Sequence, residues 1–262
     1  MLSLTANRVY LLCAFLMAFS FTVWGQSAML PLGEIVGRMQ AAELDSLSHV
    51  APYRVTRQYV LSGSDQKTSS SRVTAEISFV PPSQKDYSLG AVQGNDRVGK
   101  VVRKVLDHEA DMTSHAKRVM VSDENYSFVL LGSEVIEGHR CYVLQLTPKR
   151  DMSDLIRGRA WVDADRFMIR RMEGQPARSP SWWIKDLQVI VNYGELLGVW
   201  MQLSARATAD VRWMGRHVLT AQTLEVCTTT VSAKSLPPGQ IMSSHRSQIQ
   251  RQVAGSAAWV AR

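Results

Sequence analysis

Hydrophobic and polar residues alternate in short segments through most of the chain after residue 52. Residues 72–80 show the pattern most clearly, with apolar side chains at every second position. Such alternation is typical of a strand with one face in a core and one toward water. Strands are predicted over residues 53–61, 72–80, 85–93, 126–131, 140–147, 156–163, 166–173, 182–193, 199–208, 211–214 and 218–228. Their short spacing favours an antiparallel meander over βαβ units.

Two segments change to the spacing of an amphipathic helix, residues 32–47 and residues 96–112. Their apolar stripes are Ile35, Val36, Met39 and Leu44 in the first, and Val98, Val101, Val102, Val105 and Leu106 in the second. The residues expected to face the ligand are Ile35, Val36 and Met39, and Val98, Val101 and Val105.

The ends of the chain differ from its centre. Residues 9–24 form a continuous apolar run between a weakly basic start and the small residues of 25–28, which is the order of a secretory signal peptide. An uncleaved membrane anchor is the alternative. Residues 234–262 contain no acidic residue and are rich in Ser and Gln, which indicates a loose cationic tail. We therefore expect a signal peptide over 1–28, one β-rich domain over 29–233 and a tail over 234–262, in a periplasmic protein.

Composition excludes some classes of function. Hydrophobic residues make up 45% and charged residues 20%, a globular balance. The net charge of +7 is scattered, without the basic tracts of a nucleic-acid binder. It indicates either a solvated surface or weak attraction to anionic lipid head groups.

Sequence motifs for catalysis are missing. There is no P-loop, no dinucleotide fingerprint and no G-x-S-x-G, and the histidines beside Glu109 lack the spacing of a zinc motif. We expect a protein that is not an enzyme and that uses no cofactor and no metal.

Removal of a signal peptide leaves two cysteines, Cys141 and Cys227. In an oxidising compartment such a pair can form a disulfide, which we predict here. The alternative is two small buried side chains.

Two motifs in the middle of the chain resemble those of a known family. Residues 138–149 (GHRCYVLQLTPK) are similar to the G-x-x-C-Y-x-L-x-L-x-P-K strand of outer-membrane lipoprotein-sorting proteins. Residues 158–163 (GRAWVD) and 171–174 (RMEG) are similar to the G-x-x-W-V-D and R-x-E-G elements of the same family. The resemblance spans about residues 30–230 and is strong over 124–215. It departs at residues 225–227, where aromatic residues are expected and Glu-Val-Cys stands instead.

The resemblance implies a mainly β fold, a half-open antiparallel β-barrel closed by one or more α-helices, as in lipoprotein carriers. In that architecture the two helices lie across the open side with their apolar stripes inward. It also implies a periplasmic binding or carrier protein for lipoprotein acyl chains or another apolar ligand, in outer-membrane lipoprotein sorting or envelope maintenance. The alternative is a regulatory or adaptor protein that binds an envelope protein, because the same fold serves that role. Peripheral contact with a membrane fits either role, and no nucleic acid is expected.

The apolar faces of the predicted strands and of the second helix supply the candidate ligand-binding residues. For each of them the alternative is an ordinary core position. They are Val101, Val105, Phe128, Tyr142, Leu144, Leu146, Trp161, Leu187, Val189, Val191 and Tyr193.

The remaining tryptophans are candidates for a lipid or sugar platform, with packing at the barrel rim as the alternative. They are Trp182, Trp183 and Trp200, together with Trp161.

Overall fold

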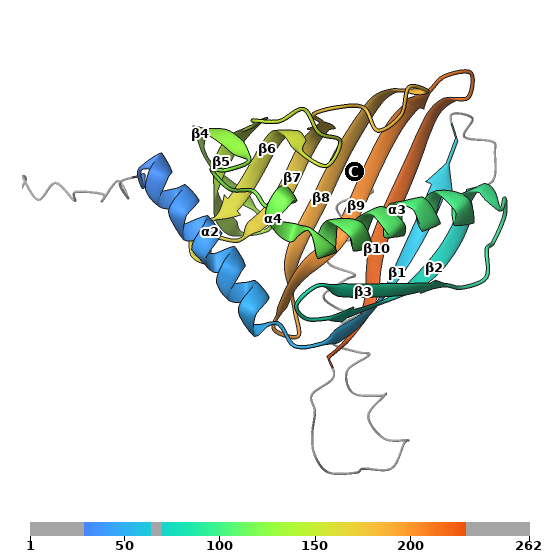
Figure 1. Cartoon of the computed structure of the whole chain (residues 1–262), viewed down its shortest axis with the longest axis horizontal. Helices are drawn as coiled ribbons and strands as arrows, with labels where there is room; N and C mark the ends of the chain where they lie inside the picture. Colours follow the sequence, from blue (N-terminus) through green and yellow to red (C-terminus); the bar gives the residue numbers. More distant parts are fainter. Residues whose placement is uncertain (1–28, 64–69, 229–262) are drawn as a thin grey trace, which may run out of the picture. The chain divides into compact units, whose positions relative to one another are not determined.

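The structure, a computed structural model, describes residues 29–63 and 70–228. The expected signal peptide and cationic tail lie outside these residues. Within them, a ten-stranded antiparallel sheet has the order β3-β2-β1-β10-β9-β8-β7-β6-β5-β4 (Figure 1). No helix in this part of the chain is long and apolar enough to cross a membrane.

The sheet and its helices belong to a compact unit that begins at Leu32. The strands are β1 (Tyr53–Ser62), β2 (Ser71–Val80), β3 (Gln84–Leu89), β4 (Tyr126–Ile136), β5 (His139–Pro148), β6 (Ile156–Asp163), β7 (Ile169–Pro176), β8 (Ile184–Leu196), β9 (Val199–Val211) and β10 (Gly215–Thr228). The helices are α2 (Leu32–His49), α3 (Arg97–Ser114) and α4 (Ala116–Val119).

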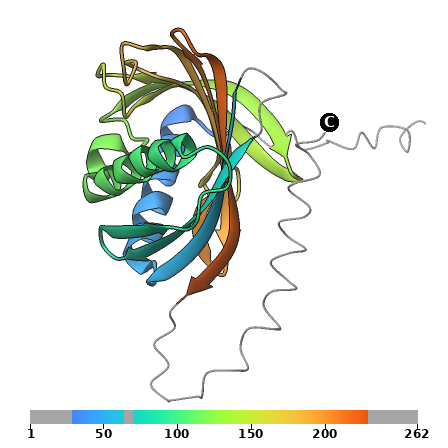
Figure 2. The ribbon, with the colours of Figure 1, turned by 90° about the vertical axis from the view of Figure 1, so that its right-hand side faces the viewer.

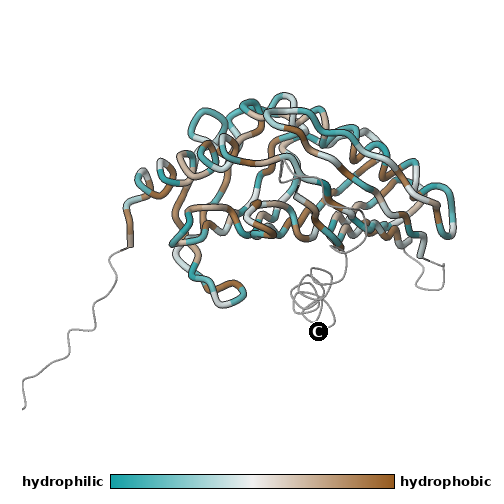
Figure 3. The backbone as a smooth tube through the Cα atoms, turned by 90° about the horizontal axis from the view of Figure 1, so that it is seen from below, coloured by the Kyte–Doolittle hydropathy of each residue, from teal (hydrophilic) through white to brown (hydrophobic). Residues whose placement is uncertain are grey.

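Most predicted elements are confirmed, and the alternation that predicts them appears as changes of colour along the tube in Figure 3. The prediction of a strand over 211–214 is wrong, because β9 ends at Val211 and a turn follows. Trp213 adopts a left-handed conformation there, with φ of 64°. The predicted start of β7 is three residues early, because the Asp163 carboxylate accepts the backbone N–H groups of Asp165 and Arg166 and builds a turn.

The sheet curves around the helices, which lie on its concave side (Figure 2). Helix α3 packs on β1, β2 and β3 through Val98, Val102 and Leu106, which are buried with Tyr59 in one cluster. Helix α2 buries Ile35, Val36 and Met39 and contacts the other end of the sheet at β4. The predicted half-open, mainly β architecture is confirmed, since β3 and β4 end the sheet without pairing to each other.

A row of directly opposite residues crosses nine strands on this concave face. From β4 to β2, in the order of the strands in the sheet, the row comprises Leu130, Leu144, Ala160, Met172, Val191, Ala205, Ala221, Tyr59 and Val73. Residues that are directly opposite in a ladder share one face of the sheet. Since Tyr59 and Val73 pack under α3, the whole row faces the helices.

Strands β6 and β7 approach each other unusually closely at Gly158 and Gly174, which are directly opposite. A Cβ added at Gly158 would lie 2.0 Å from the backbone oxygen of Glu173, and one at Gly174 would lie 2.3 Å from that of Arg157. Only glycine fits both positions. These are the glycines of the two family-like motifs, so the structure gives them a geometric role.

Candidate functional site

The middle of the concave face carries apolar residues that are only half-buried. Toward the two ends of the nine-strand row, Leu144 and Val73 are buried, with 0% and 1% exposure, while the last residue at the β4 end, Leu130, is half-buried. Between them, six apolar residues of β7, β8 and β9 are only half-buried, and we call them the apolar strip. They are Met172, Leu187, Val189, Val191, Ala205 and Ala207.

Many of the predicted ligand-binding residues lie on this concave face. Leu187, Val189 and Val191 are part of the apolar strip, and Tyr193 follows them on β8 beside a bulge. Phe128 is half-buried and opposite Leu146. Three further residues, all on β5, are almost fully covered and belong to the core in this structure: Tyr142, Leu144 and Leu146.

Trp161 lies on the convex face instead, opposite to the face expected for it. It is directly across from Val143 and packs with Cys141 and Val143 in a small separate cluster. Its indole N–H donates to Glu134 at 2.8 Å, and Arg159 stands over the ring at 5.1 Å. Its neighbours Ala160 and Val162 take the concave side, so the one-faced pattern of β6 is shifted by one residue from the prediction.

The stripe predicted for the second helix is confirmed at Val98, Val102 and Leu106 and differs at Val101. Val98, Val102 and Leu106 are buried and span an arc of about 80° at about 100° per residue. Val101 lies about 60° outside that arc and is 37% exposed, so it does not pack on the sheet as expected. Val105 lies at the border and is half-buried.

A charged cluster fastens α3 to the sheet within the concave side. The side chain of Arg57 in β1 is 6% exposed and lies 3.1 Å from the Glu109 carboxylate of α3. Lys85 of β3 lies 2.9 Å from the same carboxylate, and Arg57 also donates to the Tyr59 hydroxyl at 3.2 Å. Burial alone would raise the pKa of Glu109, but Arg57 and Lys85 outweigh it and hold that pKa below its usual value. The carboxylate therefore stays charged and bridges three elements.

The hydrophobic pattern did not reveal this cluster, although a signal was present. Arg57 alternates with Val55 and Tyr59 on the inner face of β1, where a charge is unexpected. Glu109 falls near the centre of the buried arc of α3. A charge of each sign on two apolar faces would have suggested a buried pair.

Glu43 of α2 is a second acidic group toward the interior, and it has no hydrogen bond or ion pair among the described residues. Burial raises its pKa to about 7. Burial likewise raises the pKa of Tyr193 to about 12, with further contributions from the charges of Glu109 and Glu43. The interior between the helices thus holds a tyrosine hydroxyl and an easily protonated carboxyl beside the apolar strip.

The two cysteines are far apart, and both thiols are free. Cys141 is in β5 and Cys227 in β10, and four strands lie between β5 and β10. Five strand spacings amount to about 24 Å along the sheet, whereas a disulfide needs Cα atoms about 6 Å apart. The predicted disulfide is therefore wrong for this fold. Cys141 fits the alternative of a buried small side chain, and burial raises its pKa to about 11.

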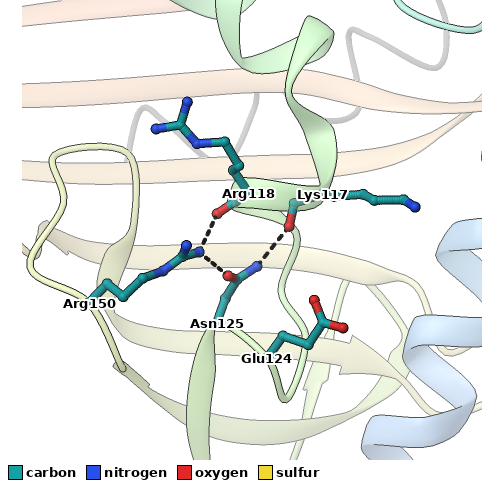
Figure 4. Close-up of a pocket in the computed structure, with 5 residues that line it drawn as sticks. All are labelled: Lys117, Arg118, Glu124, Asn125 and Arg150. Carbon is teal, nitrogen blue, oxygen red and sulfur yellow. Dashed lines mark hydrogen bonds between the residues drawn. The ribbon is translucent and has the colours of Figure 1, made fainter.

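A polar pocket of about 310 Å³ lies elsewhere, at the junction of α4 with β4 and the loop after β5 (Figure 4). The Asn125 amide donates to the backbone oxygen of Lys117 at 3.1 Å, and Arg150 donates to that of Arg118 at 3.0 Å. Arg150 also donates to the Asn125 side-chain oxygen. The side chains of Lys117 and Arg118 point away from Asn125. These bonds fix α4 to the sheet, and we assign the pocket a structural role.

The fold and its inner face define a class: an open antiparallel half-barrel with an apolar concave face flanked by two helices. No protein-family model and no curated protein matches the chain.

Solved structures with a similar fold exist. A putative outer membrane lipoprotein-sorting protein domain from Vibrio parahaemolyticus matches with a TM-score of 0.41 and 13% identity, over 84% of this chain and 96% of that one. A LolA superfamily protein from Nitrosomonas europaea matches with a TM-score of 0.36 and 12% identity, over 80% and 96%. A DUF1329 family protein from Desulfovibrio piger matches with a TM-score of 0.40 and 12% identity, over 78% and 95%. The similarity lies in the backbone fold, at low sequence identity.

Proposed function

We propose that this chain is a periplasmic binding or carrier protein, and not an enzyme, whose ligand is an acyl chain or a similar apolar group. The observation that carries the proposal is the apolar strip, a set of half-buried apolar side chains in the middle of an otherwise well-packed concave face. Apolar surface left partly open in a concave position is what an apolar ligand would cover. The resemblance of the sequence to lipoprotein-sorting proteins points the same way, toward envelope lipids or lipoproteins.

The strip offers contacts of a suitable size. Each buried methylene of a ligand contributes about 0.8 kcal/mol, so burial of about ten methylenes of an acyl chain would supply the roughly 8 kcal/mol of micromolar binding, before the cost of association. Residues of the strip come from three adjacent strands and are held by the ladder, so little ordering is needed on binding.

Uptake of a fluorescent fatty acid by the purified protein tests the proposal, with two variants of β8. Val189 faces the strip, whereas its neighbour Ile190 pairs with Glu173 and Arg206 on the convex face, and both are half-buried. We expect Val189→Asp to weaken binding at least about tenfold, because it places a charge against the acyl chain. Ile190→Asp should leave binding unchanged.

Two results would contradict this reading. One is equal loss of binding in both variants, which would reflect general damage to the sheet. The other is no uptake by the unmodified protein. Ala207→Trp, which fills the strip without adding charge, should also reduce uptake, and circular dichroism reports whether each variant folds.

A second candidate, binding of an envelope protein, is favoured by the exposed edge of the sheet at β4. This strand ends the sheet order and exposes Val129, Leu131 and Val135 to 56%, 53% and 70%. An apolar edge strand can accept a strand from another chain. A photo-crosslinking residue at position 135 in living cells tests this candidate, and absence of a defined adduct would count against it.

A further inference from the structure

Three tryptophans and a methionine are exposed together at one end of the sheet, and we call this group the tryptophan tip. It comprises Trp182 (71% exposed), Trp183 (36%), Trp213 (83%) and Met214 (49%). The first two lie in the connection between β7 and β8, and the others in the turn between β9 and β10. The rings of Trp182 and Trp213 meet edge to face, with centroids 5.8 Å apart.

The tip is held by its own hydrogen bonds. The backbone N–H of Arg212 donates to the backbone oxygen of Trp183 at 2.8 Å, which ties the two turns together. The Ser179 hydroxyl donates to the backbone oxygens of Ser181 and Ile184 at 2.9 and 3.0 Å. Trp213 has φ of 64°, a left-handed conformation that non-glycine residues rarely adopt. The indoles are therefore displayed by ordered turns, although exposure of large aromatic rings to water is unfavourable.

Positive charge surrounds the tip. Arg178, Lys185 and Arg212 are exposed and have no ion pair among the described residues. A further arginine, Arg216, pairs with Asp210 at 3.1 Å. With Asp186 as the other acid, the two segments 177–187 and 209–217 carry four cations against two anions, a net charge of +2.

Indole rings combined with unpaired cations fit one kind of surface. Tryptophan is favoured at the boundary between lipid head groups and hydrocarbon, because its ring is apolar while its N–H can donate to polar groups. Arginine and lysine are attracted to anionic head groups, and this attraction falls with added salt. We propose that the tryptophan tip docks the protein onto an anionic phospholipid bilayer.

The tip adjoins the apolar strip through the same strands. Ile184 and Val211 pair at the tip, and Leu187 pairs with Ala209 a short distance further along β8 and β9. A docked protein would therefore hold one end of the strip near the bilayer. The docking proposal rests on the exposed tip itself and holds whether or not the strip binds an acyl chain.

Co-sedimentation of the purified full chain with vesicles tests the proposal. The vesicles contain phosphatidylglycerol and phosphatidylethanolamine, and neutral phosphatidylcholine vesicles serve for comparison. We expect binding to the anionic vesicles that weakens at least about tenfold in W182S/W213S, and that weakens as salt increases in the unmodified protein. The matched control is V129S/V135S, which removes two exposed apolar side chains of the edge strand β4, outside the tryptophan tip. Thermal unfolding of all variants should be unchanged, since the replaced side chains are exposed.

The possible results separate clearly. The proposal is wrong if the unmodified protein does not bind anionic vesicles, if W182S/W213S binds as well as the unmodified protein, or if the control loses as much. It is also wrong if the tip instead mediates self-association, seen as a dimer that W182S/W213S converts to a monomer while vesicle binding persists. Quenching of tryptophan fluorescence by lipids brominated in the acyl chain gives a second readout that needs no variant. Fatty-acid uptake in solution should be equal in W182S/W213S and the unmodified protein, which keeps this test separate from that of the strip.

Discussion

Replacement of Glu43 by Gln should stabilise the protein near neutral pH. Glu43 points toward the interior from α2, without a hydrogen bond or ion pair among the described residues, and burial raises its pKa to about 7. Burying an unpaired carboxylate lowers the free energy of unfolding, and burying a neutral amide of the same shape lowers it less.

The magnitude follows from the pKa. The rise from 4.5 to about 7 corresponds to about 3.5 kcal/mol, at about 1.4 kcal/mol per pH unit. Because the folded pKa lies above the unfolded one, the contribution of Glu43 to stability is fully present below about pH 4.5. It is lost as the pH rises through about 7. The gain in Glu43→Gln should therefore be under about 1 kcal/mol at pH 5 and approach about 3 kcal/mol at pH 8.

Urea unfolding of both proteins at pH 5, 6, 7 and 8 measures this difference. Glu34→Gln is the matched control on the same helix, since the Glu34 side chain is 40% exposed and beside Arg38. Its effect on the free energy of unfolding should be small, because the side chain is exposed. Parallel curves for Glu43→Gln and the unmodified protein would refute the reasoning, because they would show that Glu43 titrates equally in the folded and unfolded states.

Three further predictions concern other parts of the fold. Gly158→Ala should destabilise the protein by about 3 kcal/mol or more in urea unfolding, because a Cβ would meet the backbone of β7. In the control Gly37→Ala on α2, the added Cβ meets nothing, so this variant should be neutral or stabilising. Equal effects of the two variants would contradict the close approach of β6 and β7. Glu109→Gln should cost about 3 kcal/mol at neutral pH. Because the folded pKa of Glu109 is lowered, its contribution to stability is present above about pH 4.5 and lost at lower pH. The free energy of unfolding of the variant should therefore fall less steeply as the pH is lowered into the acid range. An unchanged fall with acid would contradict the buried pair. Alkylation of the denatured, unreduced protein followed by mass spectrometry should find both Cys141 and Cys227 modified, and Cys141 should react slowly in the native protein; protection of both in the denatured state would restore the disulfide.

Sequence patterns predicted strands well where one face is dry and the other wet, as in β2, whose burial alternates along its length. They were less reliable for the direction of a single side chain. Trp161 was expected among the residues of the apolar cavity, yet it lies on the convex face beside Glu134 and Arg159. Val101 was expected to be buried because valines recur around it, yet it lies outside the buried arc of α3 and is 37% exposed. Trp161 has a polar partner on another strand, Glu134, and such partners are not visible in local periodicity.

The pairing of β1 with β10 has a consequence for how the protein is made. The first strand of the folded unit is hydrogen-bonded along its length to the last described strand, from Tyr53 with Thr228 to Ser62 with Val218. A chain that emerges from its N-terminal end must therefore wait for its final strand before β1, β2, β3 and α3 can join the rest of the sheet. Contacts between such distant segments form slowly. We expect the chain to remain unfolded until its synthesis and any export are complete. A chain that is truncated before β10 should aggregate through the unpaired edges of β1 and β9.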